Sequence, residues 1–221
     1  MNCPTCHAPL ARLPRARSKC KACNNWMYPS FKSVFPSTLL TEAQYSVARA
    51  LDTLQQQSPA NARVVSQALP QLRAAQDDKD GLAAVTRDLF NATEPRDDPA
   101  AAEIHWHRCA EVMARLGQDF TWALRRSAEA LLDRRMLEAV LGGSGGKGTP
   151  SETDVFVTVC YQSDACDACR STGGYESGGS EVGALRFTVA EARQRGILPH
   201  SGCQSTMSGM PGFCRCRYKV M

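Results

Sequence analysis

The chain has 221 residues, of which 43% are hydrophobic and 22% are charged, so its composition is that of a folded protein and excludes a disordered chain. Its net charge of +4 is too small to indicate a nucleic-acid partner by itself. The first residues lack the apolar segment of a signal peptide, and no run of about 18 apolar residues is present to span a bilayer. We therefore expect a cytoplasmic protein with no membrane partner. Thiols stay reduced there, so the 11 cysteines are expected to be metal ligands and packed thiols rather than disulfides.

Residues 1–36 contain two C-x2-C pairs separated by 13 residues, namely Cys3, Cys6, Cys20 and Cys23. This spacing is close to that at which four thiolates surround one Zn²⁺. Few apolar residues accompany the pairs, so we expect a zinc ribbon in which a structural ion, worth roughly 10–16 kcal/mol, replaces a hydrophobic core. His7 lies beside a ligand but is not expected to bind, because four thiolates complete the tetrahedron.

The same segment is basic, since residues 1–32 contain no Asp or Glu. Its cationic residues are Arg12, Arg15, Arg17, Lys19, Lys21 and Lys32. Trp26, Tyr28 and Phe31 stand near them. Two interpretations remain open: the aromatic rings stack on the bases of a single-stranded nucleic acid, or they cover the cysteine pairs.

Residues 37–142 are predicted to form a helical domain. Thr41, with a glutamine three residues later, predicts a capping box at the start of the first helix, and Pro59 ends that helix. A second helix should be kinked or shortened at Pro70. A third, short helix is expected after Gly81.

Two further helices complete this domain. Asp98 before Pro99 is a helix-start signal, and Gly117 should end that helix. The last helix is expected from about Asp119 to Leu141. The side chains expected to be buried in these two helices are Trp106, Cys109, Met113, Leu116, Phe120, Leu124, Leu131 and Val140.

Two features of this region are not predicted to be functional sites. His105 and His107 are two residues apart, so on a helix they point in different directions and do not share a metal. The glycine-rich segment within residues 143–153 lacks the spacing of a phosphate-binding loop and the Ser or Thr that should follow its lysine. We interpret it as a linker.

Residues 154–221 are predicted to form a small α+β domain with a second zinc site. An alternating strand over 154–161 should bury Val155, Val157 and Val159 on one face. A short helix follows in the segment TVAEARQRG. The candidate zinc ligands are Cys166, Cys169, Cys203, Cys214 and Cys216.

These five thiols compete for four positions. One solution uses Cys166, Cys169 and Cys203 with one of Cys214 and Cys216. The other replaces Cys203 by the second member of that pair, and His200 is a reserve ligand. A thioredoxin-like redox motif is the competing interpretation of the C-x2-C pair, but the glycine-rich segment that follows does not favour the helix such a motif requires.

The order of these motifs resembles a group of bacterial and phage-associated zinc-ribbon proteins. The resemblance lies in the N-terminal cysteine pairs and the segments LLTEAQ, DACDACRSTGG and GFCRCRY. The C-terminal part is also similar to the tail of phage minor head (head morphogenesis) proteins, in which C-x2-C is followed by His-x2-Cys-Arg-Cys. In this chain ten residues, 204–213, separate HSGC from CRC. The resemblance implies a setting in mobile DNA or a prophage, with phage or capsid proteins as partners.

We therefore predict an α+β, mainly helical protein with an N-terminal zinc ribbon, a helical middle domain and a C-terminal zinc-stabilised domain. The expected function is a non-enzymatic, zinc-binding interaction module for nucleic acid or an acidic protein surface. The first alternative is a structural or assembly protein of a phage-like particle. An enzyme is the second alternative, although the sequence contains no evident nucleophile with a base and no metal motif with a vacant position.

Overall fold

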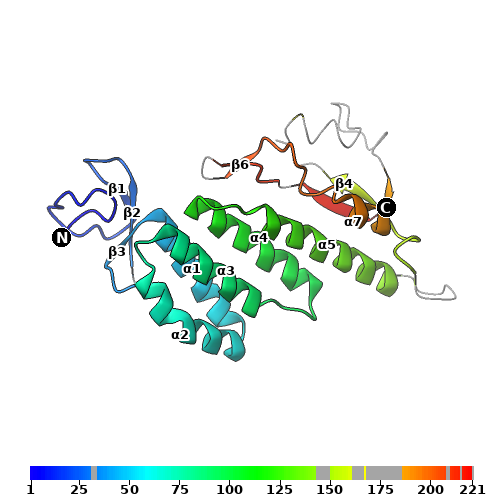
Figure 1. Cartoon of the computed structure of the whole chain (residues 1–221), viewed down its shortest axis with the longest axis horizontal. Helices are drawn as coiled ribbons and strands as arrows, with labels where there is room; N and C mark the ends of the chain where they lie inside the picture. The colour runs from blue at the N-terminus through cyan, green and yellow to red at the C-terminus, as the bar shows by residue number, and fades with distance from the viewer. Residues whose placement is uncertain are drawn as a thin grey trace. The chain divides into compact units, whose positions relative to one another are not determined.

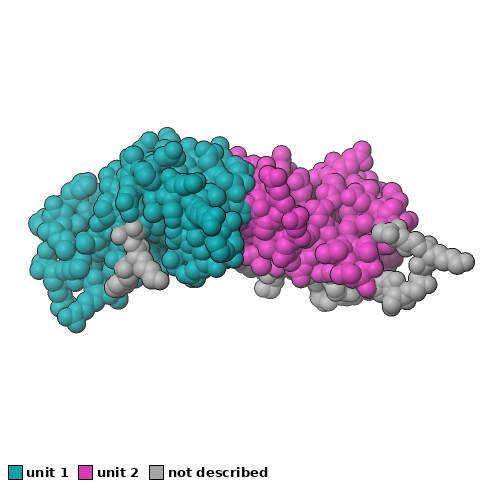
Figure 2. All heavy atoms as spheres, turned by 90° about the horizontal axis from the view of Figure 1, so that it is seen from below, with its two compact units in different colours: residues 1–93, 115–118 teal, residues 94–114, 119–221 magenta. Residues whose placement is uncertain are grey.

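The computed structural model describes residues 1–30, 34–142, 150–160, 167, 186–207, 210–214 and 216–220. The fold is α+β and mainly helical, as predicted (Figure 1). Figure 2 colours the two compact units, which consist of residues 1–93 with 115–118 and of residues 94–114 with 119–221. The predicted division into 1–36, 37–142, 143–153 and 154–221 stays a prediction. Within the described residues, no helix combines the length and apolar character that a membrane crossing requires.

The first unit begins with a small antiparallel sheet in the order β1-β2-β3. The strands are β1 (Ser18–Lys19), β2 (Trp26–Pro29) and β3 (Leu39–Leu40). Ser18 pairs with Met27, and Tyr28 pairs with Leu40. The strand β2 therefore links the cysteine-rich hairpin to the segment that enters the first helix.

Three helices complete this unit: α1 (Glu42–Gln57), α2 (Pro59–Ala74) and α3 (Lys79–Ala92). The predicted capping box is confirmed, since the Gln44 N–H donates to Thr41 Oγ1 at 3.2 Å and the Thr41 N–H donates to Gln44 Oε1 at 3.0 Å. Gln44 Nε2 also donates to the carbonyl of Gln76 at 2.9 Å. This buried glutamine thus ties the start of α1 to the turn between α2 and α3.

Two helix boundaries differ from the prediction. The helix α2 continues through Pro70 to Ala74. Pro70 cannot donate a hydrogen bond to Ser66, but both residues are exposed, so water can satisfy the carbonyl. The helix α3 starts before Gly81, with Asp78 as its N-cap. A Cβ at residue 81 would lie 2.6 Å from Asp78 Oδ2, which explains a glycine within the first turn.

The second unit contains most of α4 (Pro99–Leu116) and all of α5 (Thr121–Gly142). The Ala101 N–H donates to Asp98 Oδ1 at 3.0 Å, which confirms the predicted start of α4, and Gly117 ends this helix with a φ of +75°. The side chains predicted to be buried are buried except one. The prediction is wrong for Val140, which is 38% exposed because the last turn of α5 extends beyond the residues that pack against it.

The remaining elements form a three-stranded antiparallel sheet in the order β5-β4-β8, a hairpin and a short helix. They are β4 (Phe156–Cys160), β5 (Phe187–Thr188), α7 (Val189–Arg195), β6 (Thr206–Met207), β7 (Met210–Pro211) and β8 (Arg217–Val220). Val155, Val157 and Val159 are buried together, as the alternating pattern predicted. Glu191 closes a capping box with Thr188, which confirms the helix expected in TVAEARQRG.

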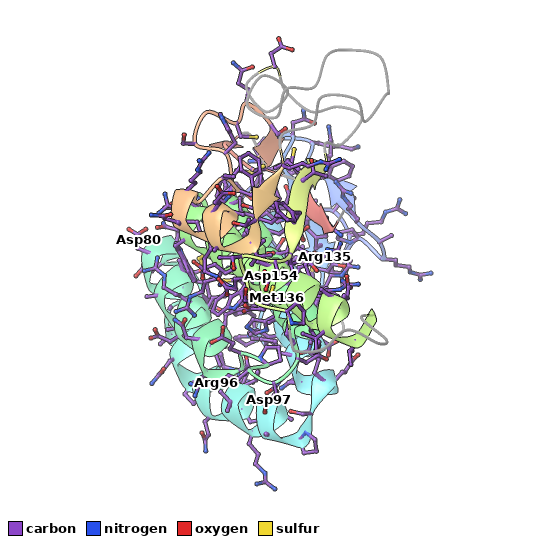
Figure 3. The ribbon with its side chains drawn as sticks, turned by 90° about the vertical axis from the view of Figure 1, so that its right-hand side faces the viewer. Asp80, Arg96, Asp97, Arg135, Met136 and Asp154 are labelled. Carbon is purple, nitrogen blue, oxygen red and sulfur yellow. The ribbon has the colours of Figure 1, made fainter. Side chains whose placement is uncertain are left out.

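Tyr218 of β8 lies in the core of this unit and contacts several of its elements. It is 1% exposed and belongs to one apolar cluster with the valines of β4 and with Leu131 and Leu132 of α5. Its hydroxyl accepts a hydrogen bond from the Leu198 N–H at 3.1 Å, and its carbonyl accepts one from Arg135 Nε at 3.2 Å. Figure 3 labels Arg135 and its neighbour Met136 on α5, and Met136 packs against the same cluster.

The Tyr218 hydroxyl should make the stability of this unit sensitive to alkaline pH. Burial, opposed by the hydrogen bond from Leu198, raises the pKa of Tyr218 from 10 to about 12. The raised pKa stabilises the fold fully below pH 10, and this contribution of roughly 3 kcal/mol is lost as the pH rises through the folded-state pKa.

Replacing Tyr218 with Phe should remove this pH dependence. The variant leaves the Leu198 N–H without an acceptor, so below pH 10 it should unfold about 1–3 kcal/mol more easily than the parent chain. Urea unfolding at successive pH values should show the two free energies converging between pH 10 and 12. Parallel curves over that range would contradict the assignment.

Candidate metal centre and basic groove

The two N-terminal cysteine pairs fold into the same local structure. In the first pair, the His7 N–H donates to the Cys3 carbonyl at 3.0 Å, and the Cys3 N–H donates to the Ala8 carbonyl at 2.9 Å. In the second, the equivalent bonds run from Asn24 to Cys20 at 2.8 Å and from Cys20 to Asn25 at 2.9 Å. We call each of these turns a knuckle, namely residues 3–8 and 20–25. Each knuckle closes a β-turn-like loop that presents both of its thiols on one side.

The residue after the second cysteine of each knuckle adopts a left-handed backbone. His7 has a φ of +58° and Asn24 a φ of +59°. Asparagine tolerates this conformation, whereas histidine adopts it less readily than glycine does. This left-handed residue reverses the chain direction immediately after the second cysteine of each pair. It is therefore part of the turn that holds the two cysteines together. His7 itself is not part of the group of ligand atoms that the structure brings together.

The four thiols meet at a spacing that suits a metal ion. Their Sγ atoms all lie within 4.8 Å of one another, with 3.9 Å between Cys3 and Cys23 and 3.7 Å between Cys6 and Cys20. A tetrahedral ion with metal–sulfur bonds of about 2.3 Å requires sulfur atoms about 3.8 Å apart. A disulfide would bring two sulfur atoms to about 2.05 Å. The Cys3, Cys6, Cys20 and Cys23 cluster could therefore hold a metal ion.

The pKa values of two of these thiols are shifted in opposite directions. The N–H groups of Cys23 and Ala22 donate to Cys20 Sγ and lower the pKa of Cys20 to about 6. At Cys6 the Ala8 N–H also lowers the pKa, but hydrogen bonds among the thiols, with Cys23 first, and burial together raise it to about 12.

The remaining predicted ligands are placed differently. Cys166 and Cys169 lie outside the described residues. Cys203 and Cys214 are buried in the core cluster of the second unit, and Cys216 packs against it. Among described side chains, only the N-terminal thiols form a group of three or more ligand atoms at metal-binding distances. The cysteines whose side chains are described form no disulfide.

The hairpin β6–β7 shortens the separation between the two halves of the C-terminal motif. Thr206 pairs with Pro211 and Met207 with Met210. At the base of the hairpin, the Ser205 carbonyl accepts hydrogen bonds from Gly212 at 2.9 Å and from Phe213 at 3.0 Å. The strands β6 and β7 thus return the chain between Cys203 and Cys214, and both cysteines belong to the core cluster of this unit.

A small cavity in the second unit brings together polar and thiol side chains that are not predicted from the sequence to be neighbours. Glu103, His107, Cys214, Cys216 and Arg217 all contribute to its lining. Glu103 and His107 are four residues apart on α4, and this spacing was the only sequence signal for their shared face. Burial, assisted by Arg217 and opposed by Glu111, lowers the pKa of His107.

This cavity does not have the size of a substrate site. Its volume of about 30 Å³ is enough for one or two water molecules. Glu103 is already paired, with Arg134 Nη1 at 3.2 Å and Arg217 Nη1 at 3.7 Å. The arrangement is therefore a polar network around the buried Glu103 carboxylate, with His107 and two cysteines beside it.

The basic residues of the N-terminal segment line an open hollow between the knuckles, which we call the basic groove (residues 8–22 with Met27). Its volume is about 1140 Å³. Its charged residues are Arg12, Arg15, Arg17, Lys19 and Lys21. No acidic residue occurs before Glu42, so the groove is uniformly cationic.

The aromatic residues beside this groove have separate roles. Tyr28 is buried and stacks on Tyr45 of α1, with ring centroids 4.3 Å apart. Burial raises the pKa of Tyr28, as expected for a core position. Trp26 is half-buried and carries the Arg17 guanidinium 3.8 Å above its ring. Phe31 lies outside the described residues.

No protein-family model matches the chain, and no significant match was found among curated proteins or solved structures. The function is therefore inferred from the thiol cluster and the groove.

Replacing Cys20 with Ser should remove one metal ion from the chain, because three thiolates hold a tetrahedral ion far less tightly than four. Native mass spectrometry of protein purified under reducing conditions measures the change. Cys109→Ala is the matched control, since Cys109 is buried in α4 and outside the cluster. Equal metal content in both variants would contradict the site.

Replacing His7 with Gly should stabilise the metal-loaded protein by about 1 kcal/mol, because glycine adopts the left-handed backbone without a Cβ penalty. His7→Val should destabilise it by a similar or larger amount. Metal content should be unchanged in the glycine variant. If the ion is lost in His7→Gly, histidine is a ligand and the four-thiol assignment is wrong.

Proposed function

We propose that the chain is a non-enzymatic zinc-binding protein whose N-terminal zinc ribbon acts as an interaction module for nucleic acid. The observation that carries this proposal is the set of four Sγ atoms at tetrahedral spacing. Thiolate ligands favour Zn²⁺ over hard cations, and a Cys₄ shell leaves no position for a substrate or water. The ion would therefore be structural.

Zinc would take the place of a hydrophobic core in this module. The buried cluster there consists of Cys3, Cys20 and Met27, with Leu10 and Cys23 packed against it. Such a cluster buries little aliphatic surface, and the metal would supply the missing stability. Because both knuckles hold the loop that carries the arginines and lysines, binding of the ion would also fix the shape of the basic groove.

The uniform positive charge of the groove supports a polyanionic partner. Phosphates of a nucleic acid or carboxylates of an acidic protein surface could neutralise it. Arginine is the favoured residue for phosphate because its planar fork matches the phosphate oxygens. Three of the five cationic residues in the groove are arginines, and nucleic acid is therefore the partner that we propose.

A second structural zinc ion belongs to the same proposal. Its candidate ligands are Cys166 and Cys169, which lie outside the described residues, together with Cys203, Cys214 and Cys216. The hairpin β6–β7 supports this set, because it returns the chain between Cys203 and Cys214. A count of two zinc ions per native chain, falling to one in Cys203→Ser, is the expected result.

The second candidate function is assembly of a phage-like particle in the cytoplasm. The hairpin β6–β7 supports this candidate too. Ten residues lie between HSGC and CRC in the sequence, but the hairpin returns the chain between their cysteines. That order of thiols resembles the ending of phage minor head proteins. Co-purification with capsid or portal proteins tests this candidate, and their absence from the purified material would leave nucleic-acid binding as the explanation.

Metal removal should weaken nucleic-acid binding by the full chain. Metal-loaded protein, protein stripped with a chelator and the Cys20→Ser variant would be compared on immobilised nucleic acid over a salt gradient. The loaded protein should elute at the highest salt, because only it holds the cationic side chains in one groove. Reloading the stripped protein with zinc should restore retention. Equal retention of all three samples would show that the ribbon does not carry the binding.

A further inference from the structure

Trp26 and Arg17 form a stacked pair at the edge of the basic groove. The Arg17 Cζ lies 3.8 Å from the centroid of the Trp26 ring and 5.4 Å from that of Tyr28. Stacking uses the flat face of a guanidinium and leaves its N–H groups, which point outward in the plane, available as donors. Arg17 is exposed, and no ion pair joins it to any acidic residue within the described part of the chain. The indole therefore fixes the orientation of a guanidinium with open edges.

The rings of Trp26 and Tyr28 are already occupied by contacts within the protein, so they do not offer free faces for stacking on nucleic-acid bases. Tyr28 is 7% exposed and packs face to face with Tyr45. Trp26 is half-buried, with Arg17 on its ring and the Lys19 ammonium 5.1 Å from the ring centroid. Tyr28 thus packs against α1, and Trp26 supports the Arg17 guanidinium.

The rest of the groove extends this site along a line of positive charge. Arg12, Arg15, Lys19 and Lys21 line the same hollow as Arg17. Its apolar wall includes Leu10, Leu13 and Met27. A concave surface with successive cations suits a flexible chain that can follow it, whereas a duplex is usually read by an element that projects into its grooves.

We propose that the basic groove binds single-stranded nucleic acid through its phosphate backbone, with one phosphate held by the Arg17 fork on Trp26. This inference rests on the proposed function and specifies its ligand. The guanidinium donates two N–H groups to two oxygens of the phosphate, and the other cations neutralise neighbouring phosphates. With five cations engaged, the logarithm of the affinity should fall with the logarithm of salt concentration with a slope of about −3.5.

The test uses the zinc-loaded full chain and a fluorescein-labelled oligothymidylate of about 15 nucleotides, within the range that one binding site covers. Binding is measured by fluorescence anisotropy between about 50 and 200 mM salt. Arg17→Ala should weaken binding by about tenfold or more and reduce the slope by about 0.7. Arg17→Lys keeps the charge but loses the fork, so it should weaken binding severalfold with the slope unchanged.

Matched controls come from the helices of the same unit. Arg49 of α1 and Arg63 of α2 are exposed and lie outside the groove. Arg49→Ala and Arg63→Ala change the net charge by the same amount as Arg17→Ala and should change the affinity less than twofold. The zinc content of each variant is checked by native mass spectrometry. Because all three arginines are exposed, their replacement removes no core residue.

Four further results would overturn the inference. Arg17→Lys binding as tightly as the parent chain would exclude the fork. A duplex of the same length, or a polyglutamate peptide of the same charge, binding at least as tightly as the oligothymidylate would assign the groove to another class of partner. If the zinc-loaded chain binds none of these polyanions, the proposed function fails as well. If it binds the oligonucleotide but Arg17→Ala equals Arg49→Ala, only this inference fails.

Discussion

The N-terminal structure depends on four thiols that meet in one place. They belong to Cys3, Cys6, Cys20 and Cys23. Two knuckles with the same hydrogen bonds bring the four Sγ atoms within 4.8 Å of one another. The buried cluster around them contains only Met27 and Leu10 besides cysteines. So little aliphatic surface is buried in this segment that the thiols themselves make up most of its small core, and the cluster they form could hold a metal ion.

The loop between the knuckles inherits its shape from that cluster. Cys6 and Cys20 fix the two ends of the loop, and its arginines and lysines line one hollow because the ends are held. Two aromatic residues of β2, Trp26 and Tyr28, make different contacts. Tyr28 packs on Tyr45 and connects the N-terminal sheet to α1, while Trp26 carries the Arg17 guanidinium at the edge of the groove. The packing contact with α1 and the support of Arg17 thus come from alternate residues of one strand, β2.

The second unit is stabilised in a different way. Leu131, the valines of β4 and Tyr218 provide an apolar core of ordinary composition. Cys203 and Cys214 are buried within this core, so each thiol there has a packing role whether or not it also binds a metal. Cysteines therefore belong to a buried cluster in both units, a small one around the N-terminal thiols and a larger apolar one around Tyr218.

The helix starts at Thr41 and Asp98, the alternating strand of β4 and the N-terminal thiol set could all be predicted from the amino-acid sequence. Each depends on contacts between residues close in the chain or on a fixed ligand spacing. The sequence did not determine the continuation of α2 past Pro70 or the exposure of Val140, because these depend on which faces the rest of the fold leaves in solvent. The stacking of Tyr28 on Tyr45, the shared cavity of His107 and Cys214, and the return of the chain between Cys203 and Cys214 were decided by tertiary structure alone. Those contacts join residues from separate elements, and the local patterns that sequence analysis reads carry no information about which elements will meet.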